Sequence, residues 1–78
     1  MNTLKQTRAG LVICIRNDGY EVSLERRKIY EALVDTDARK HHQIRVIDES
    51  GEDYLFPEDF FVPVQLPRQA ERAVIEAA

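Results

Sequence analysis

The chain has little of several residue types on which small domains often depend. Its 78 residues include no tryptophan, one cysteine, one methionine, three glycines and three prolines. A lone cysteine cannot form an intrachain disulfide, and Cys14 lies in an apolar run, so we expect a buried structural thiol in a reducing compartment. The sequence also lacks a run of about 18 apolar residues and the apolar core of an export signal. We therefore expect a soluble cytoplasmic protein that makes no membrane contact.

The charge balance limits the classes of partner. The chain carries 11 Lys and Arg against 14 Asp and Glu, a net charge of −3. Non-specific binding to phosphates depends on clustered cations, so nucleic acid is a disfavoured partner. A domain of this length buries only a little over about 60% of its unfolded surface, which favours a surface groove over an enclosed active site. Because no catalytic, metal or nucleotide motif is present, we expect no enzyme activity, no metal and no cofactor.

The first half of the chain predicts two strands separated by a long loop. An apolar run rich in β-branched residues at 11–15 predicts the first strand, and Asn17-Asp18-Gly19 predicts the reversal that ends it. Residues 20–27 predict a loop whose alternating apolar side chains tuck under the domain. Residues 28–35 carry apolar side chains in both alternating sets, as a barrel strand can, so they predict the second strand; a helix over 24–34 is the alternative.

The second half predicts a polar loop, a hairpin, a corner and a terminal helix. The predicted elements, in chain order, are a loop at 36–42, strands at 43–47 and 54–56 joined by an acidic turn, one helical turn at 58–60, a strand at 61–66 and a helix at 67–78. Gly51 suits the left-handed position of the hairpin turn. Pro57 cannot donate to a strand ladder, so sheet pairing is expected to break there.

This order of elements resembles the SH3-like barrel over residues 10–66. The closest local similarity is YLFPEDFFV at 54–62, which is similar to the proline, corner and aromatic-valine close of SH3 domains with one extra residue. The chain also resembles a group of short uncharacterised bacterial proteins with an RVIDESGEDYLFP-type core. The resemblance implies a mainly β fold: a small SH3-like five-stranded barrel, preceded by a flexible leader at 1–9 and followed by the helical tail. It implies no activity.

The chain departs from SH3 domains at the residues that bind peptides. An SH3 groove uses an aromatic cluster, a tryptophan that opens the third strand, and a closing proline and tyrosine. Here only Pro57 matches, since tryptophan is absent and Phe60 or Phe61 replaces the tyrosine whose hydroxyl would bond a peptide carbonyl. Recognition of PxxP segments depends on that surface. We therefore expect a modified groove in place of a PxxP site.

Basic residues in the two loops indicate where such a groove would lie. In an SH3-like barrel the 17–28 and 36–42 loops flank one groove, with the acidic hairpin at the far end. The candidate partner-binding residues are Tyr20, Arg26, Arg27, Arg39, Lys40, Pro57 and Phe60. The sequence therefore predicts a non-catalytic interaction module that binds an unidentified protein or peptide partner in this groove. A nucleic-acid-binding barrel is the alternative function, and a homodimer through an edge strand is an alternative partner arrangement.

Two further clusters invite sharper hypotheses. Four carboxylates surround Gly51, but the segment is too short for the calcium-binding loop, and a hydrophilic hairpin tip that protects strand edges explains it better. His41 and His42 are adjacent and have no nearby ligand at metal spacing, so a solvated loop is the simpler interpretation. A pH-sensing role for this pair rests on residue type alone.

Overall fold

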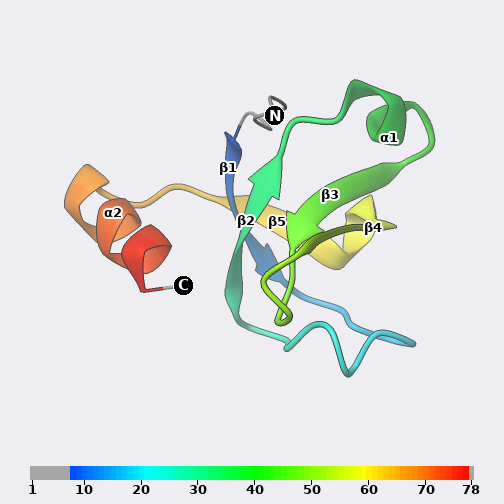
Figure 1. The fold of residues 1–78 in the computed structure, drawn as a ribbon, viewed down its shortest axis with the longest axis horizontal. Coiled ribbons are helices and arrows are strands. Elements are labelled where there is room, and N and C mark those ends of the chain that lie inside the picture. Colours follow the sequence, from blue (N-terminus) through cyan, green and yellow to red (C-terminus); the bar gives the residue numbers. More distant parts are fainter. Residues whose placement is uncertain (1–7, 78) are drawn as a thin grey trace.

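A computed structural model describes residues 8–77, which form one antiparallel five-stranded sheet with short helical elements (Figure 1). The elements, in chain order, are β1 (Arg8–Cys14), β2 (Ile29–Leu33), α1 (Thr36–Lys40), β3 (Gln43–Ile47), β4 (Asp53–Pro57), the 3₁₀ turn η1 (Glu58–Phe60), β5 (Phe61–Val64) and α2 (Arg68–Glu76). The strand order is β4-β3-β2-β1-β5. Among the described strands, β4 and β5 are the edges and do not pair with each other, so the sheet is open.

All five predicted strands are confirmed, with ends that differ by a few residues. β1 begins at Arg8, three residues before the expected start at residue 11, and most of the predicted leader lies outside the described residues. β2 confirms the strand prediction over the helix alternative, because Tyr30 and Ala32 are buried while Ile29, Glu31 and Leu33 on the other face are partly exposed. This burial of alternate residues is the pattern of a strand with one face toward the core.

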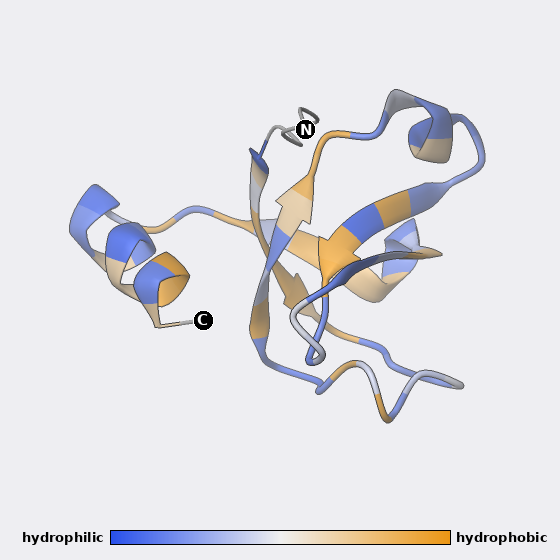
Figure 2. Ribbon diagram, viewed as in Figure 1, coloured by the Kyte–Doolittle hydropathy of each residue, from blue (hydrophilic) through white to orange (hydrophobic). Residues whose placement is uncertain are grey.

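The core lies on one face of the curled sheet. Figure 2 shows the hydrophobic residues of the strands in orange. The buried cluster consists of Val12, Cys14, Leu24, Tyr30, Ala32, Val46, Phe56, Phe60 and Phe61. β1 and β2 each contribute two alternate residues, the other three strands contribute one each, and four of the nine residues are aromatic. Phe56 lies edge-on to Phe61, with ring centroids 6.2 Å apart. Such edge-to-face pairs are a favoured aromatic geometry.

The 17–28 loop confirms the loop prediction, but its side chains do not all tuck inward. Leu24 is 1% exposed and belongs to the core, whereas Val22 is 94% exposed. The amides of Ser23 and Leu24 both donate to the carbonyl of Tyr20, at 2.9 Å each. This turn breaks the two-residue period, so the expectation that alternate residues share one buried side is wrong for Val22.

The expected loop at 36–42 is wrong, because its first five residues form helix α1. Asp35 is the N-cap, and its carboxylate accepts a bond of 2.9 Å from the amide of Ala38. The same carboxylate accepts from Arg45 Nε at 2.8 Å, and Ala38 is buried. These two bonds, with the Ala38 amide bond the larger, lower the pKa of Asp35. Sequence reasoning missed the N-cap signal of an aspartate three residues before a buried alanine.

The proline-led corner is confirmed, but the expected break of sheet pairing at Pro57 is wrong, because the nitrogen of Pro57 points away from β3 and the amide of Glu58 still donates to the carbonyl of His42. β4 ends at Pro57, which still lies opposite Gln43, and one 3₁₀ turn then redirects the chain into β5. The carbonyl of Phe60 accepts bonds from the amides of Ile15, at 2.7 Å, and Arg16. The corner is therefore joined to the end of β1, which places Phe60 of η1 beside the start of the long loop.

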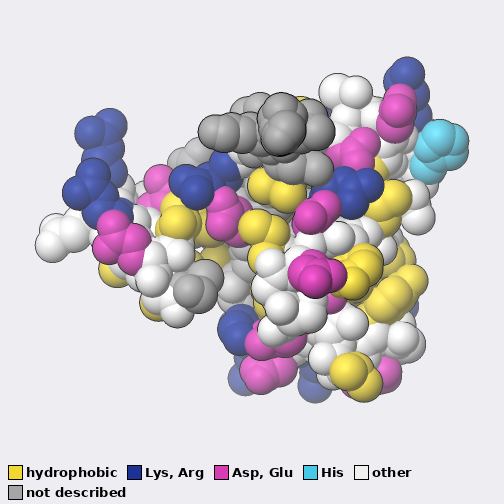
Figure 3. Space-filling view, viewed as in Figure 1, with side chains coloured by type: hydrophobic (Ala, Val, Ile, Leu, Met, Phe, Trp, Pro, Cys, Tyr) yellow, Lys and Arg dark blue, Asp and Glu magenta, His cyan; other side chains and the backbone are white. Residues whose placement is uncertain are grey.

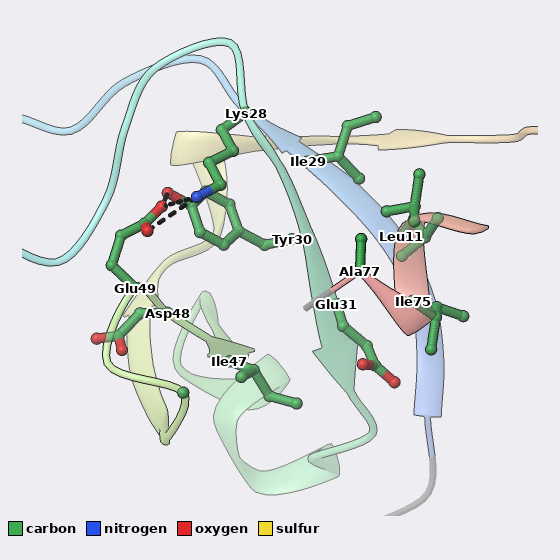
Figure 4. Close-up of a pocket in the computed structure, with 12 residues that line it drawn as sticks. Leu11, Lys28, Ile29, Tyr30, Glu31, Ile47, Asp48, Glu49, Ile75 and Ala77 are labelled. Atoms are coloured by element: carbon green, nitrogen blue, oxygen red, sulfur yellow. Dashed lines mark hydrogen bonds and ion pairs between the residues drawn. The ribbon is translucent and has the colours of Figure 1, made fainter. Parts of the chain in front are cut away.

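The terminal helix is confirmed as α2, and it lies to one side of the sheet (Figure 1). Pro67 directly precedes it, and none of its residues is buried. Its apolar residues Val74 and Ile75 line a hollow of about 480 Å³, together with Leu11 and Ile29 on the outer face of the sheet. Figure 4 shows Ile75 beside Leu11. Neither α1 nor α2 has the length and apolarity that a membrane crossing requires.

Candidate functional site

An exposed tyrosine from the long loop is held on two core phenylalanines. The ring of Tyr20 lies edge-on to Phe56, with centroids 5.2 Å apart, and to Phe60, at 5.7 Å. Both phenylalanines are buried, whereas Tyr20 is 38% exposed. The two core phenylalanines therefore hold the Tyr20 ring in place, and the exposed part of the ring is available for contact with a partner.

Tyr54 extends this feature along β4. It is 49% exposed, and with Tyr20 and Phe56 it lines a shallow hollow of about 410 Å³. Polar side chains, Ser23 and Ser50, line the same hollow. We call the residues Tyr20, Tyr54, Phe56 and Phe60 the aromatic surface. Apolar walls with a few polar groups are typical of binding sites.

Charged side chains border the aromatic surface on the η1 side. The guanidinium of Arg16 lies over the Phe60 ring, 5.3 Å from its centroid, in a cation–π arrangement. Arg16 also pairs with Asp18 at 3.0 Å and with Asp59 at 3.8 Å. These pairs are exposed and contribute little to stability, but they hold the guanidinium over the ring.

The structure brings Tyr20 and Phe60 together, as the predicted site requires, and places Pro57 at the adjacent corner. Tyr54 was missed by sequence reasoning. The signal was available, since Tyr54 is two residues from the buried Phe56 and side chains at that spacing share a face of a strand. Arg16 was also missed, because its position over Phe60 depends on the contact between the corner and the end of β1.

The basic residues of the predicted site do not gather around one groove. Figure 1 shows α1 at the top of the molecule and the 17–28 loop along the bottom, with β3, β4 and η1 between them. Arg39 lines a separate hollow near β2 and β5, together with Glu58, and Lys40 lies 3.8 Å from Asp37. None of the four hollows found in the described part of the chain is lined by both basic segments. Cations and carboxylates are interspersed on the face in Figure 3.

The expectation that the acidic hairpin lies far from the basic end of the long loop is wrong. Lys28 Nζ lies 2.6 Å from Glu49 Oε2, and the amide of Glu49 donates to the carbonyl of Ser23 at 3.1 Å. The hairpin tip therefore packs against the long loop, next to Arg26 and Arg27. This contact weakens the case for the nucleic-acid alternative, because a carboxylate neutralises part of the basic segment.

Glu49 is the centre of a clamp between the hairpin and the long loop (Figure 4). Its carboxylate accepts from Lys28 Nζ at 2.8 Å and from the Tyr30 hydroxyl at 2.5 Å. The Tyr30 hydroxyl in turn accepts from the amide of Glu25 at 2.8 Å. Bonds from Lys28 and then Tyr30 lower the pKa of Glu49, while burial and then the bond to Glu49 raise the pKa of Tyr30.

The other carboxylates of the acidic turn also have structural partners. Asp48 is buried and accepts from the amide and hydroxyl of Ser50, at 2.8 and 2.6 Å. Asp53 accepts from Arg45 Nη1 at 2.9 Å, and Glu52 accepts from the Tyr54 hydroxyl at 3.0 Å. Within residues 8–77, no group of three His, Cys, Asp or Glu side chains is arranged to hold a metal ion. These partners account for the carboxylates as parts of the hairpin.

Replacing Glu49 with alanine is expected to lower the free energy of unfolding by about 1–3 kcal/mol, because the buried Tyr30 hydroxyl loses its acceptor. Since folding lowers the pKa of Glu49, its contribution is complete above its unfolded pKa of about 4.3 and is lost as pH falls through the lower folded value. Urea titrations between pH 7 and pH 3 should therefore show a smaller acid loss for Glu49→Gln than for the wild type.

Glu52→Gln is the matched control for this change, because it removes a carboxylate from the same turn whose partner, the Tyr54 hydroxyl, is exposed. It should follow the acid profile of the wild type. An identical acid profile for Glu49→Gln and the wild type would contradict the clamp.

Comparison of the chain with protein-family models, with curated proteins and with solved structures found no match in any of the three. A proposal for the function of this chain therefore rests on the aromatic surface and its neighbouring residues alone.

Proposed function

We propose that this chain is a non-catalytic interaction module that binds a protein or peptide partner over the aromatic surface. The exposed Tyr20 ring, packed edge-on against two buried phenylalanines, carries this proposal. Tyrosine is enriched among residues that dominate binding energies, since it offers a large, stiff contact area with a polar tip. A ring already fixed by the core loses little further freedom when a partner binds.

We also propose that the open sheet is a variant of the SH3-like barrel. Support comes from the consecutive antiparallel pairing of β1 to β4, from the return of β5 beside β1 and from the single-turn corner at η1. In this fold the partner would lie on the β4 and η1 side, between the long loop and α1, which is where Tyr20, Pro57 and Phe60 occur.

A reducing cytoplasm is the proposed location. Support comes from Cys14, which is fully buried and whose Sγ lies 3.1 Å from the carbonyl of Arg16. Burial raises the pKa of this thiol, which favours the unreactive protonated form. Cys14 thus fits a structural role.

Replacing Tyr20 with serine is expected to weaken partner capture strongly while the fold is retained. Tagged wild type, Tyr20→Ser and Val22→Ser would be incubated with lysate of the source organism, and the retained proteins compared by quantitative mass spectrometry. Val22 is the matched control, since it belongs to the same loop and is almost fully exposed. At least one partner should be retained by the wild type and by Val22→Ser, and reduced about tenfold or more with Tyr20→Ser, the loss expected for removing a hot-spot tyrosine.

Equal capture by all three chains would contradict the proposed site. Capture of nothing, together with a lone monomer in sizing at several concentrations, would contradict the interaction module itself. Far-ultraviolet circular dichroism of Tyr20→Ser would confirm that the variant is folded.

A further inference from the structure

The hydrogen-bond register of β3 and β4 leaves part of β4 unpaired. The amide of Asp48 donates to the carbonyl of Glu52, and the amide of Glu58 donates to the carbonyl of His42. Antiparallel strands alternate between bonded and non-bonded pairs. In the register of β4, Tyr54 and Phe56 therefore bond to β3, whereas the N–H and C=O of Asp53 and Leu55 point away from the sheet.

The opposite edge of the sheet is closed to pairing. The amide of Ile15 donates to the carbonyl of Phe60, so in the register of β5 the residues that point away from β1 are Phe61 and Pro63. The amide of Phe61 donates to the carbonyl of Glu58, and Pro63 has no N–H. Of the two edges formed by the described strands, only β4 therefore retains outward N–H donors.

The free edge of β4 lies beside the aromatic surface. Leu55 lines the shallow hollow together with Tyr20 and Tyr54, so a chain that pairs with β4 would place a side chain next to these rings. Strand addition of this kind takes affinity from main-chain bonds and specificity from pockets for alternate side chains.

The charges that flank β4 favour one kind of occupant. Glu52 and Asp53 lie at its start, and Glu58 and Asp59 follow its end. Two β4 strands paired antiparallel would bring the acidic start of each copy against the acidic end of the other, which is unfavourable. Lys or Arg in an added strand would instead face carboxylates at both ends.

We propose that the partner of this module is an extended, basic peptide segment that adds a strand to β4 and places an apolar or aromatic side chain against Tyr20 and Tyr54. This inference rests on the proposed function, and it names the partner class and the binding mode. Main-chain bonds would form at Asp53 and Leu55, while the Pro57 carbonyl adds an acceptor and no donor.

The test uses ¹⁵N-labelled full-length chain and the capped peptide KVKFKVK. Amide hydrogen exchange at Asp53 and Leu55 is expected to slow by about tenfold or more on binding, because both N–H groups gain an acceptor, while Tyr54 and Phe56 are already protected. EVEFEVE, with the same apolar residues and opposite charge, should bind more weakly, and affinity for KVKFKVK should fall as salt rises.

Leu55→Pro removes one outward N–H and keeps the bonds between β3 and β4, so it should fold and lose peptide binding. KVKFKVK with alternate amides N-methylated removes the reciprocal bonds, those that the peptide N–H groups would donate to the outward carbonyls of β4. This peptide keeps the test decisive if Leu55→Pro does not fold.

Three outcomes would overturn strand addition: no binding of KVKFKVK, equal binding of its N-methylated form, or binding without protection of Asp53 and Leu55. A concentration-dependent dimer protected at the same two amides would identify a second copy as the occupant and would overturn the proposal of a basic peptide partner. The interaction module stands or fails separately, on the capture experiment with Tyr20→Ser and Val22→Ser.

Discussion

Replacing Phe56 with alanine is expected to lower the free energy of unfolding by about 3–5 kcal/mol. The side chain is 2% exposed and contacts the rings of both Tyr20 and Phe61, so its removal leaves a cavity at the centre of the aromatic cluster. A domain of 78 residues has a total stability of roughly 4–12 kcal/mol. The variant should therefore lose a large part of its stability, and urea unfolding monitored by circular dichroism measures the change.

Tyr54→Ala is the control for Phe56→Ala, because it removes an aromatic side chain from the same strand and the same face, where the ring is half exposed. Its cost should stay below about 1 kcal/mol. Similar losses for the two variants would contradict the division of this strand into a buried core residue and an exposed binding residue.

Replacing Leu24 with alanine is expected to cost about 2–5 kcal/mol. Leu24 is the residue of the long loop that joins the core cluster, and it is among the most buried side chains of the described chain. The change should also increase amide exchange in the 17–28 loop, because the hydrophobic anchor of the loop is lost. Urea unfolding and hydrogen exchange measure the two effects.

Val22→Ala is the matched control, since Val22 lies two residues away and is almost fully exposed. Its free energy of unfolding should stay within about 0.5 kcal/mol of the wild type. A small cost for Leu24→Ala, or increased exchange spread evenly over the sheet, would mean that Leu24 does not anchor the loop.

The strands could be predicted from the sequence because each is a short run rich in β-branched or aromatic residues, and the structure then buries alternate residues of such a run. Tyr30 and Ala32 show this most clearly, since they alternate with partly exposed neighbours in β2. The η1 corner was predictable as well, because Pro57 restricts the backbone of Phe56 to extended geometry and permits a turn directly after itself. Helix α1 was missed because its start depends on one capping bond, which the Asp35 carboxylate accepts from the amide of Ala38. The polar composition of the segment alone does not reveal this bond.

The candidate site was only partly predictable. Tyr20 and Phe60 were expected to line one groove through the resemblance to SH3-like barrels, and the structure places the two ring centroids 5.7 Å apart. The predicted basic groove does not form in the structure. The positions of its charged side chains depend on ion pairs between distant segments, such as Lys28 with Glu49, which the sequence does not reveal. The outward N–H groups of β4 likewise follow from the hydrogen-bond register between β3 and β4, which cannot be read from the sequence alone.

The most direct test of the interaction module is a chemical-shift map of the ¹⁵N-labelled chain with the partner that Tyr20→Ser fails to capture. The account predicts that the largest amide shifts cluster at Tyr20, Tyr54 and Phe60, with α2 unaffected. Shifts confined to α2 and the outer face of β1 and β2 would contradict it, because the partner would then occupy the opposite face of the sheet.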